Sequence, residues 1–198
     1  MFSFRHVLLK FLMPVSKFIG KIHSPWSRKK IKAKQVEQVL KLAEPGDILL
    51  SRTMGELTNF AIQGYFKHAA MYVFDKTVCE SISPETSLTN LYDFLMSKDA
   101  FCLLRPSWLK QEERLKAAQI MTSLCGKPYD YMFDIGEQAF YCAESCWFSL
   151  SKACDTDEDI FKRRTTMGVQ TVLPQDFFDA KSKFELVAAF PWAEMPSR

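Results

Sequence analysis

Short apolar runs and longer amphipathic stretches follow one another along most of the chain. Strands are predicted where short runs rich in aliphatic or aromatic residues are bounded by polar or turn residues. They cover residues 47–51, 68–74, 78–82, 101–106 and 184–190. Helices are predicted where apolar residues recur every three to four positions. They cover residues 35–43, 88–96, 109–125 and 140–153, with a helical turn started by Pro174.

Two segments have a less regular pattern. Residues 54–66 are expected to be helical or irregular, and residues 127–138 a loop or a broken helix. In the helix predicted for residues 109–125, one apolar face is expected to run from Leu115 through Met121 to Cys125. Because strands dominate the first half and helices flank them, the pattern predicts an α+β fold in which a mostly antiparallel sheet packs against helices.

Composition is consistent with one folded domain and a separate N-terminal arm. The chain has 198 residues, of which 47% are hydrophobic and 25% charged, as in globular proteins. Residues 1–34 are rich in Lys and Arg and contain no Asp or Glu. We therefore expect a basic amphipathic arm over residues 1–34 and a domain over residues 35–198.

The arm is neither a clean signal peptide nor a membrane-spanning segment, because lysines interrupt its apolar run. A basic amphipathic segment can lie on an anionic membrane surface, and it can equally pack on its own domain with a solvated basic face. We expect a cytoplasmic protein, with membrane association through the arm as an open alternative. The net charge of +3 is too small to indicate a nucleic-acid partner.

Six cysteines and three histidines limit the chemistry that the chain can carry out. No pair of cysteines has C-x-x-C spacing, no further ligands stand at diagnostic spacing from Cys142 and Cys146, and no nucleotide-binding loop is present, so no metal or other cofactor is expected. The most suggestive stretch is AFYCAESCWFSL, residues 139–150, which carries Cys142 and Cys146 four residues apart. These are either two buried thiols, two metal ligands, or a nucleophile and a packing residue.

Nucleophilic catalysis by cysteine needs a thiolate, an imidazole and a group that orients the imidazole. Cys142 lies near the start of its predicted helix, where backbone N–H groups favour a thiolate, whereas Cys146 lies one turn further on. His68 opens a predicted strand, and Glu80 on the next strand is placed to hold its ring. On these residues alone, a core cysteine and a hydrogen-bonded core histidine remain an equal alternative.

The order of several short motifs resembles the circularly permuted papain-like amidases of the YiiX/YaeF type. These are relatives of the NlpC-type cell-wall amidases and of lecithin–retinol acyltransferase. The motifs are PGDILLS, KHAAMYV, VCES, GKPYDYMF and FYCAES, in that order between Pro45 and about Ser149. In papain the cysteine precedes the histidine, whereas here His68 precedes Cys142, as a permutation requires.

The resemblance implies a permuted papain-like fold with the nucleophile at a helix N-terminus. It implies Cys142 as nucleophile, His68 as general base and Glu80 as the orienting acid, the last being the weakest match. Tyr129 matches a tyrosine that lines the site in the family, and its alternative is a half-buried loop tyrosine. Glu144 matches a family glutamate, for which we expect a structural or capping role.

The activity implied is hydrolysis of an amide bond, in a peptide or peptidoglycan-like substrate, through a cysteine acyl-enzyme. One alternative is a lipid-ester hydrolase or acyltransferase at a membrane surface, because the acyltransferase relatives act on lipids. Another is a binding module without catalysis that keeps the same scaffold.

Overall fold

The structure is a computed structural model that describes residues 31–53, 62–133, 135–154, 160–161, 163–166 and 169–191. Nearly all of the predicted arm and residues 54–61 of the segment expected to be helical or irregular lie outside these residues. No helix within the described ranges is long and apolar enough to cross a membrane.

One six-stranded sheet forms the centre of the fold, in the order β4-β3-β2-β1-β5-β8, with every neighbouring pair antiparallel. Its strands are β1 (Ile48–Arg52), β2 (His68–Phe74), β3 (Thr77–Ser81), β4 (Thr86–Asn90), β5 (Ala100–Pro106) and β8 (Phe184–Phe190). A separate short ribbon pairs β6 (Arg164–Thr166) with β7 (Val169–Thr171). The predicted α+β class with a mostly antiparallel sheet is confirmed.

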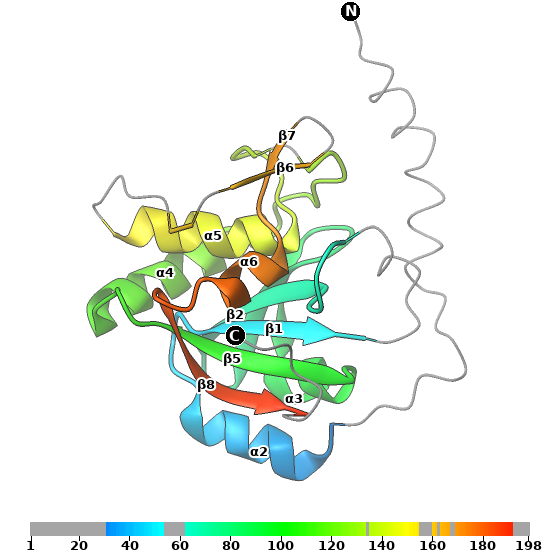
Figure 1. Cartoon of the computed structure of the whole chain (residues 1–198), viewed down its shortest axis with the longest axis vertical. Coiled ribbons are helices and arrows are strands. Elements are labelled where there is room, and N and C mark those ends of the chain that lie inside the picture. The colour runs from blue at the N-terminus through cyan, green and yellow to red at the C-terminus, as the bar shows by residue number, and fades with distance from the viewer. Residues whose placement is uncertain are drawn as a thin grey trace, which may run out of the picture.

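Helices cover both faces of this sheet (Figure 1). They are α2 (Ala33–Leu42), α3 (Leu91–Met96), α4 (Gln111–Ser123), α5 (Cys142–Ala153) and α6 (Pro174–Asp179). On one face, side chains of α4, α5 and α6 pack with Ile48, Leu50 and Met71 into the larger core. On the other face, α2 and α3 pack with Leu49 and Tyr72. Alternate residues of β1 and β2 therefore face different cores, as a strand buried on both sides requires.

The buried acid of the PGDILLS motif joins the start of β1 to β5. Asp47 accepts two hydrogen bonds from Arg105, to Oδ1 from Nε at 2.9 Å and to Oδ2 from Nη2 at 2.7 Å. Before it, Gly46 has φ +89°, and a Cβ there would lie 2.5 Å from the carbonyl oxygen of Arg114 on α4. This close approach requires glycine, so the motif fixes where the first strand enters the sheet.

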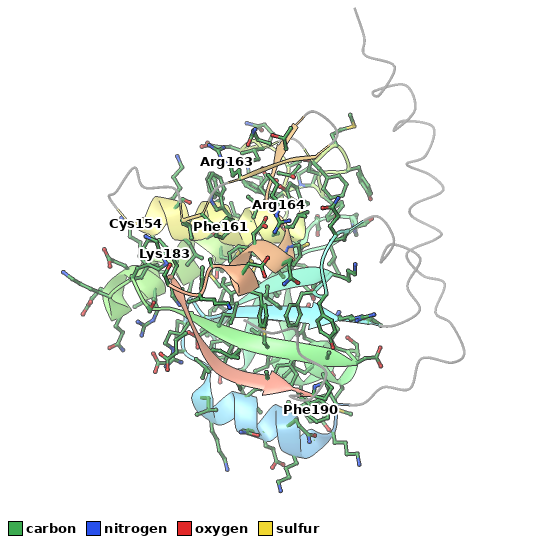
Figure 2. All side chains as sticks on the ribbon, viewed as in Figure 1. Cys154, Phe161, Arg163, Arg164, Lys183 and Phe190 are labelled. Atoms are coloured by element: carbon green, nitrogen blue, oxygen red, sulfur yellow. The ribbon has the colours of Figure 1, made fainter. Side chains whose placement is uncertain are left out.

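Two sequence predictions are wrong in detail. The helix expected over residues 88–96 begins only at Leu91, because residues 86–90 form the edge strand β4 against β3. Leu115 and Cys125 were expected on the apolar face of this helix, but Leu115 is 47% exposed and Cys125 lies exposed in the turn after α4, whereas the helix buries Ala117, Ala118 and Met121. The short β6–β7 ribbon was not predicted. Figure 2 shows Arg164 of this ribbon above α6, where it forms an ion pair with Asp176.

Candidate active site

Cys142 is the first residue of helix α5, two residues after the start predicted from the sequence. The preceding residue, Tyr141, is the N-cap and has an extended backbone. Its N–H donates a hydrogen bond to Glu144 Oε2 at 3.3 Å. Glu144 Oε1 accepts a second hydrogen bond from Gly136 N–H at 2.8 Å, and the Tyr141 hydroxyl accepts one from Val172 N–H at 2.9 Å. The expected capping role of Glu144 is confirmed, and these contacts fix the helix start on which the thiol is carried.

Strands β2 and β3 separate beside this helix start. They pair only as far as Met71 and Cys79, and the next residue, Glu80, pairs with β4 in the described sheet. The N–H of Tyr72 donates to the backbone carbonyl of Asp47, just before β1. Because the N–H groups of successive residues in a strand point to opposite sides, the N–H of Ala69 points toward β3. This N–H therefore faces the opening between the two strands.

His68 and Glu80 meet across that opening. His68 Nε2 lies 2.7 Å from Glu80 Oε2, and the other carboxylate oxygen, Oε1, accepts a hydrogen bond from the Thr89 hydroxyl at 2.7 Å. The side chain of Glu80 is nearly buried, and that of His68 is 17% exposed. The Phe94 ring of α3 lies beside the imidazole, with ring centroids 6.0 Å apart. Both carboxylate oxygens are thus occupied, so the position of the ring is well defined.

The Cys142 thiol reaches the imidazole from the other face of the sheet. The imidazole of His68 and the backbone N–H groups of Ala69 and Ala143 lie close enough to the sulfur to lower the pKa of the thiol. Because Glu80 occupies Nε2, Nδ1 is the ring nitrogen left for the sulfur. The structure therefore brings together the three residues that the sequence analysis selected.

Burial and charge act in opposite directions on this cluster. Burial alone raises the pKa of Cys142, but the hydrogen bond from His68 and the two backbone N–H groups outweigh it and lower that pKa. Burial alone lowers the pKa of His68, but contacts with Cys142 and Glu80 raise it to about 9. The pair therefore favours a thiolate beside an imidazolium at neutral pH.

Glu80 provides the negative charge that holds this arrangement. Burial alone raises its pKa, but the hydrogen bond and the charge of His68, the charge of Lys98 and the Thr89 hydroxyl together lower it to about 2. The carboxylate is therefore ionised throughout the neutral range. Lys98 Nζ lies over the Phe94 ring, 4.8 Å from its centroid, so it supports the site from the α3 side.

Tyr129 lies close to the thiol. Its ring packs against the core cluster that contains Cys142, and its pKa is raised by burial and then by the charge of Cys142. Its ring packs edge-on against Tyr131, with centroids 5.0 Å apart, and its N–H is donated to the carbonyl of Pro84 at 2.8 Å. A half-buried tyrosine next to the nucleophile position can contact a bound substrate.

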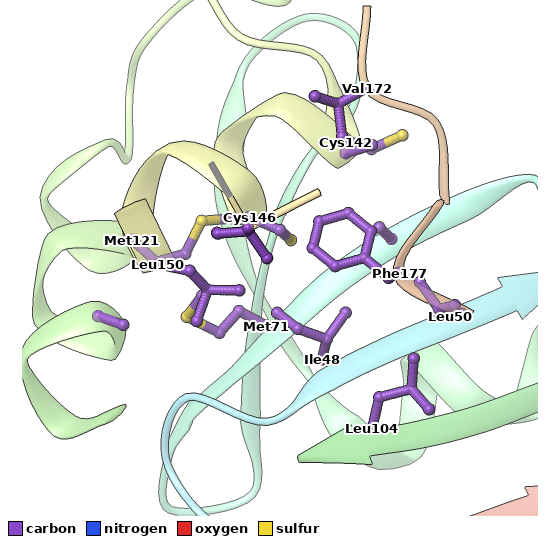
Figure 3. Close-up of a cluster of buried hydrophobic side chains, with 14 of the residues drawn as sticks. Ile48, Leu50, Met71, Leu104, Met121, Cys142, Cys146, Leu150, Val172 and Phe177 are labelled. Atoms are coloured by element: carbon purple, nitrogen blue, oxygen red, sulfur yellow. The ribbon is translucent and has the colours of Figure 1, made fainter. Parts of the chain in front are cut away.

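Cys146 occupies the position that packing predicts. It is fully buried, and burial raises its thiol pKa well above the usual range. Figure 3 shows it one helical turn from Cys142, among Met121, Leu150 and Met71, whereas the sulfur of Cys142 points away from it. The two cysteines of the AFYCAESCWFSL stretch therefore have different environments.

Three residues of this site were not found from the sequence. Thr89 lies on a strand that was read as helix, and Phe94 and Lys98 belong to the helix and turn that follow it. No motif marks them, because they act through contacts formed only after β4 pairs with β3.

Comparison with known proteins identifies the family to which the chain belongs. A family model described as permuted papain-like amidase enzyme, YaeF/YiiX, C92 family, matches residues 42–187. The chain belongs to this family of amidase enzymes. Among solved structures, this permuted papain-like chain is similar to the crystal structure of the metalloprotein YiiX from Escherichia coli O157:H7. The TM-score is 0.63 at 21% sequence identity, covering 74% of this chain and 97% of that one. No curated protein sequence matches.

At this identity the similarity to YiiX shows a shared fold. The YiiX description as a metalloprotein raises the question of a metal site in this permuted papain-like amidase. Among the residues that the structure describes, no group of three or more His, Cys, Asp or Glu side chains is placed to hold a metal ion. The chemistry considered below is that of the described side chains.

Proposed function

We propose that the protein is a thiol amidase that cleaves an amide bond in a peptide or peptidoglycan-like substrate through a Cys142 acyl-enzyme. The observation that supports this most is the succession of interacting side chains from Cys142 through His68 to Glu80, in which His68 lowers the pKa of the thiol and lies 2.7 Å from the carboxylate of Glu80. Membership in a family of amidase enzymes supports the bond type. Each of the three residues then has a separate role.

In the first half-reaction the thiolate of Cys142 attacks the carbonyl carbon of the amide and a C–S bond forms. The oxygen becomes an oxyanion, and the backbone N–H of Cys142 in the first turn of α5 is the natural donor to it, because such groups have no partner within the helix. His68 then gives its proton to the leaving nitrogen as the C–N bond breaks, which leaves an acyl thioester on Cys142.

In the second half-reaction His68, now neutral, takes a proton from water. The resulting hydroxide equivalent attacks the thioester carbonyl, and the C–S bond breaks to regenerate the thiolate and release the acid. Glu80 keeps the imidazole oriented through Nε2 and stabilises its positive charge during both steps. Tyr129 contributes to binding the substrate beside the sulfur.

A lipid-ester hydrolase or acyltransferase would use the same thiol and the same thioester, with a different acyl group and acceptor. The basic sequence of residues 1–34 is the feature that keeps this alternative in view. A non-catalytic binding module would make no thioester at all.

Intact-protein mass spectrometry separates these readings. The protein is incubated with libraries of amides and of lipid esters, and quenched in acid to preserve thioesters. An acyl adduct from amides, located on Cys142 by peptide mapping and missing in Cys142→Ala, is the expected result. An adduct formed only from esters would replace the amidase proposal with the lipid alternative.

The reactivity of the thiols themselves provides a second measurement. Iodoacetamide should label one thiol quickly at neutral pH, and the fast phase should disappear in Cys142→Ala. If six thiols all label slowly, the scaffold serves binding and the enzyme proposal is wrong.

A further inference from the structure

A second pair of sulfur atoms lies outside the proposed catalytic residues. Cys79 on β3 and Cys125 in the turn after α4 have their Sγ atoms 3.8 Å apart. Cys79 is fully buried and its thiol donates to the carbonyl of Met121 at 3.4 Å, whereas Cys125 is exposed. The proposed amidase reaction uses neither sulfur.

The backbone, rather than the two side chains, holds these sulfurs together. The turn that carries Cys125 is hydrogen-bonded to the edge strand β4 through both backbone groups of Thr86. Gly126 N–H donates to the Thr86 carbonyl at 2.9 Å, and Thr86 N–H donates to the Lys127 carbonyl at 2.9 Å. Since β4 is paired with β3, the turn cannot move away from Cys79 without breaking this ladder.

A disulfide needs its sulfurs at about 2.05 Å and its Cβ atoms at about 3.8 Å. Sulfurs already at 3.8 Å on a fixed turn approach that geometry by side-chain rotation and a small local shift. We propose that Cys79 and Cys125 are a modification site: a dithiol that low-molecular-weight disulfides convert reversibly into an intramolecular disulfide.

Exposure sets the order of the two exchange steps. The Cys125 thiolate attacks one sulfur of the small disulfide, whose S–S bond breaks and releases one small thiolate. The Cys79 thiolate then attacks Cys125 Sγ in the mixed disulfide and expels the second small thiolate. The two protons lost by the cysteines end on the two small thiols, so one small disulfide is reduced for each protein disulfide formed.

Burial makes the second step the slow one. It raises the pKa of the Cys79 thiol well above the usual range, and the neighbouring Cys125 raises it further. Because only a small fraction of Cys79 is present as the thiolate, exchange over minutes to hours is expected.

Cys142→Ala is the protein for the test, because the reactive Cys142 would otherwise compete for the reagent. The native full-length variant is incubated with oxidised glutathione. Free thiols are then alkylated in denaturant, and peptides are mapped without reduction. We expect two of the five remaining thiols to be lost and one cross-linked peptide pair that contains Cys79 and Cys125.

A matched double variant, Cys142→Ala with Cys125→Ser, should form no cross-link, and since Cys125 is exposed the added substitution should not impair folding. The cross-link closes a long loop, so it should raise the melting temperature by about 5 °C or more, and a reducing agent should reverse the rise. A stable glutathione adduct on Cys125 beside a free Cys79 would overturn the proposal. So would a bond from Cys79 to Cys146, which belongs to the same core cluster. Neither readout depends on amidase activity.

Discussion

Nε2 of His68 and Oε2 of Glu80 lie 2.7 Å apart across the opening between strands β2 and β3. The distance is that of a charge-assisted hydrogen bond, in which the imidazolium donates to the carboxylate. One residue comes from the first position of its strand and the other from the fourth position of the next, where the two strands no longer pair. Because Nε2 is used by Glu80, the other ring nitrogen, Nδ1, is the one available to Cys142.

The first prediction concerns the protonation of His68. Its pKa is raised from the ordinary 6.5 to about 9, so the imidazole should stay charged through neutral pH and lose its proton near pH 9. Because the pKa of His68 is raised in the folded protein, the contacts of the imidazolium with Cys142 and Glu80 stabilise the fold fully below about pH 6.5. This stabilisation is lost as the pH rises through about 9. An NMR titration of the imidazole signals, with His68→Gln to assign the signal among the three histidines, measures it.

Two results would count against this protonation state. A His68 signal that titrates near pH 6.5 would mean that the imidazole is neutral at physiological pH. Cys142→Ala should lower the pKa of His68, because a contact that raises it is removed; an unchanged value would show that the thiol does not interact with the ring.

The second prediction is that Glu80→Gln weakens both the site and the fold. The amide keeps the size of the side chain but not its charge, so the pKa of His68 should fall and alkylation of Cys142 at neutral pH should slow by at least about tenfold. Since the pKa of Glu80 is lowered from 4.5 to about 2, its ionised form stabilises the native state above about pH 5, by roughly 3–4 kcal/mol at most.

That stabilisation is lost as pH falls from about 5 toward 2, so the difference in unfolding free energy between wild type and Glu80→Gln should shrink over the same window. Urea unfolding at a series of pH values measures it. Equal differences at pH 7 and pH 3 would contradict the lowered pKa of Glu80.

The third prediction tests Thr89 as a positioning residue. Its hydroxyl donates to Glu80 Oε1 at 2.7 Å, while Oε2 receives His68. Thr89→Val removes the hydroxyl without changing the shape, so the pKa of His68 should fall and the fast alkylation of Cys142 should slow several-fold. Thr89→Ser, which keeps the hydroxyl, should restore both. If valine and serine behave alike, Thr89 contributes only packing.

The sequence pointed to the proposed catalytic residues more clearly than to the residues that position them, such as Thr89. Cys142 could be found because an aromatic residue, a cysteine and a glutamate mark a capped helix start, and His68 because it opens an apolar strand. Thr89 could not, since residues 86–90 have weak strand character and merge with the helical pattern of α3. They form a strand because β3 offers a partner, which is a tertiary effect.

The same reason explains the other differences. Leu115 fits the apolar period of α4, but the helix packs through the small residues Ala117 and Ala118, which leaves Leu115 in solvent. Asp47 was read as the start of a strand, and its partner Arg105 is 58 residues away in sequence. No local pattern connects two such residues, so the pairing appears only once β1 and β5 lie side by side.

The fourth prediction separates the two cysteines of α5. Cys146 is fully buried in the larger core, so Cys146→Ala should leave a small cavity and destabilise the fold by about 1 kcal/mol. It has no part in the proposed reaction, and the fast alkylation phase should therefore survive in this variant. Thermal unfolding and iodoacetamide kinetics on the same sample test both statements. Loss of the fast phase with the fold intact would move the reactive thiol from Cys142 to Cys146.

The last prediction is that the basic arm binds anionic membranes and is dispensable for folding. Its basic residues with no acid favour anionic phospholipid, and its apolar positions at helical spacing favour burial at the interface. The deletion is best made after residue 30, because Ile31 is only 3% exposed and packs with Val36 and Val39 in the smaller core. Removing residues 1–30 should abolish co-sedimentation with anionic vesicles and leave the melting temperature nearly unchanged.

Binding by the intact chain should weaken as salt rises, because screening acts on exposed charges, and it should be weak on neutral vesicles. A large fall in melting temperature on deletion would instead mean that the arm packs on the domain.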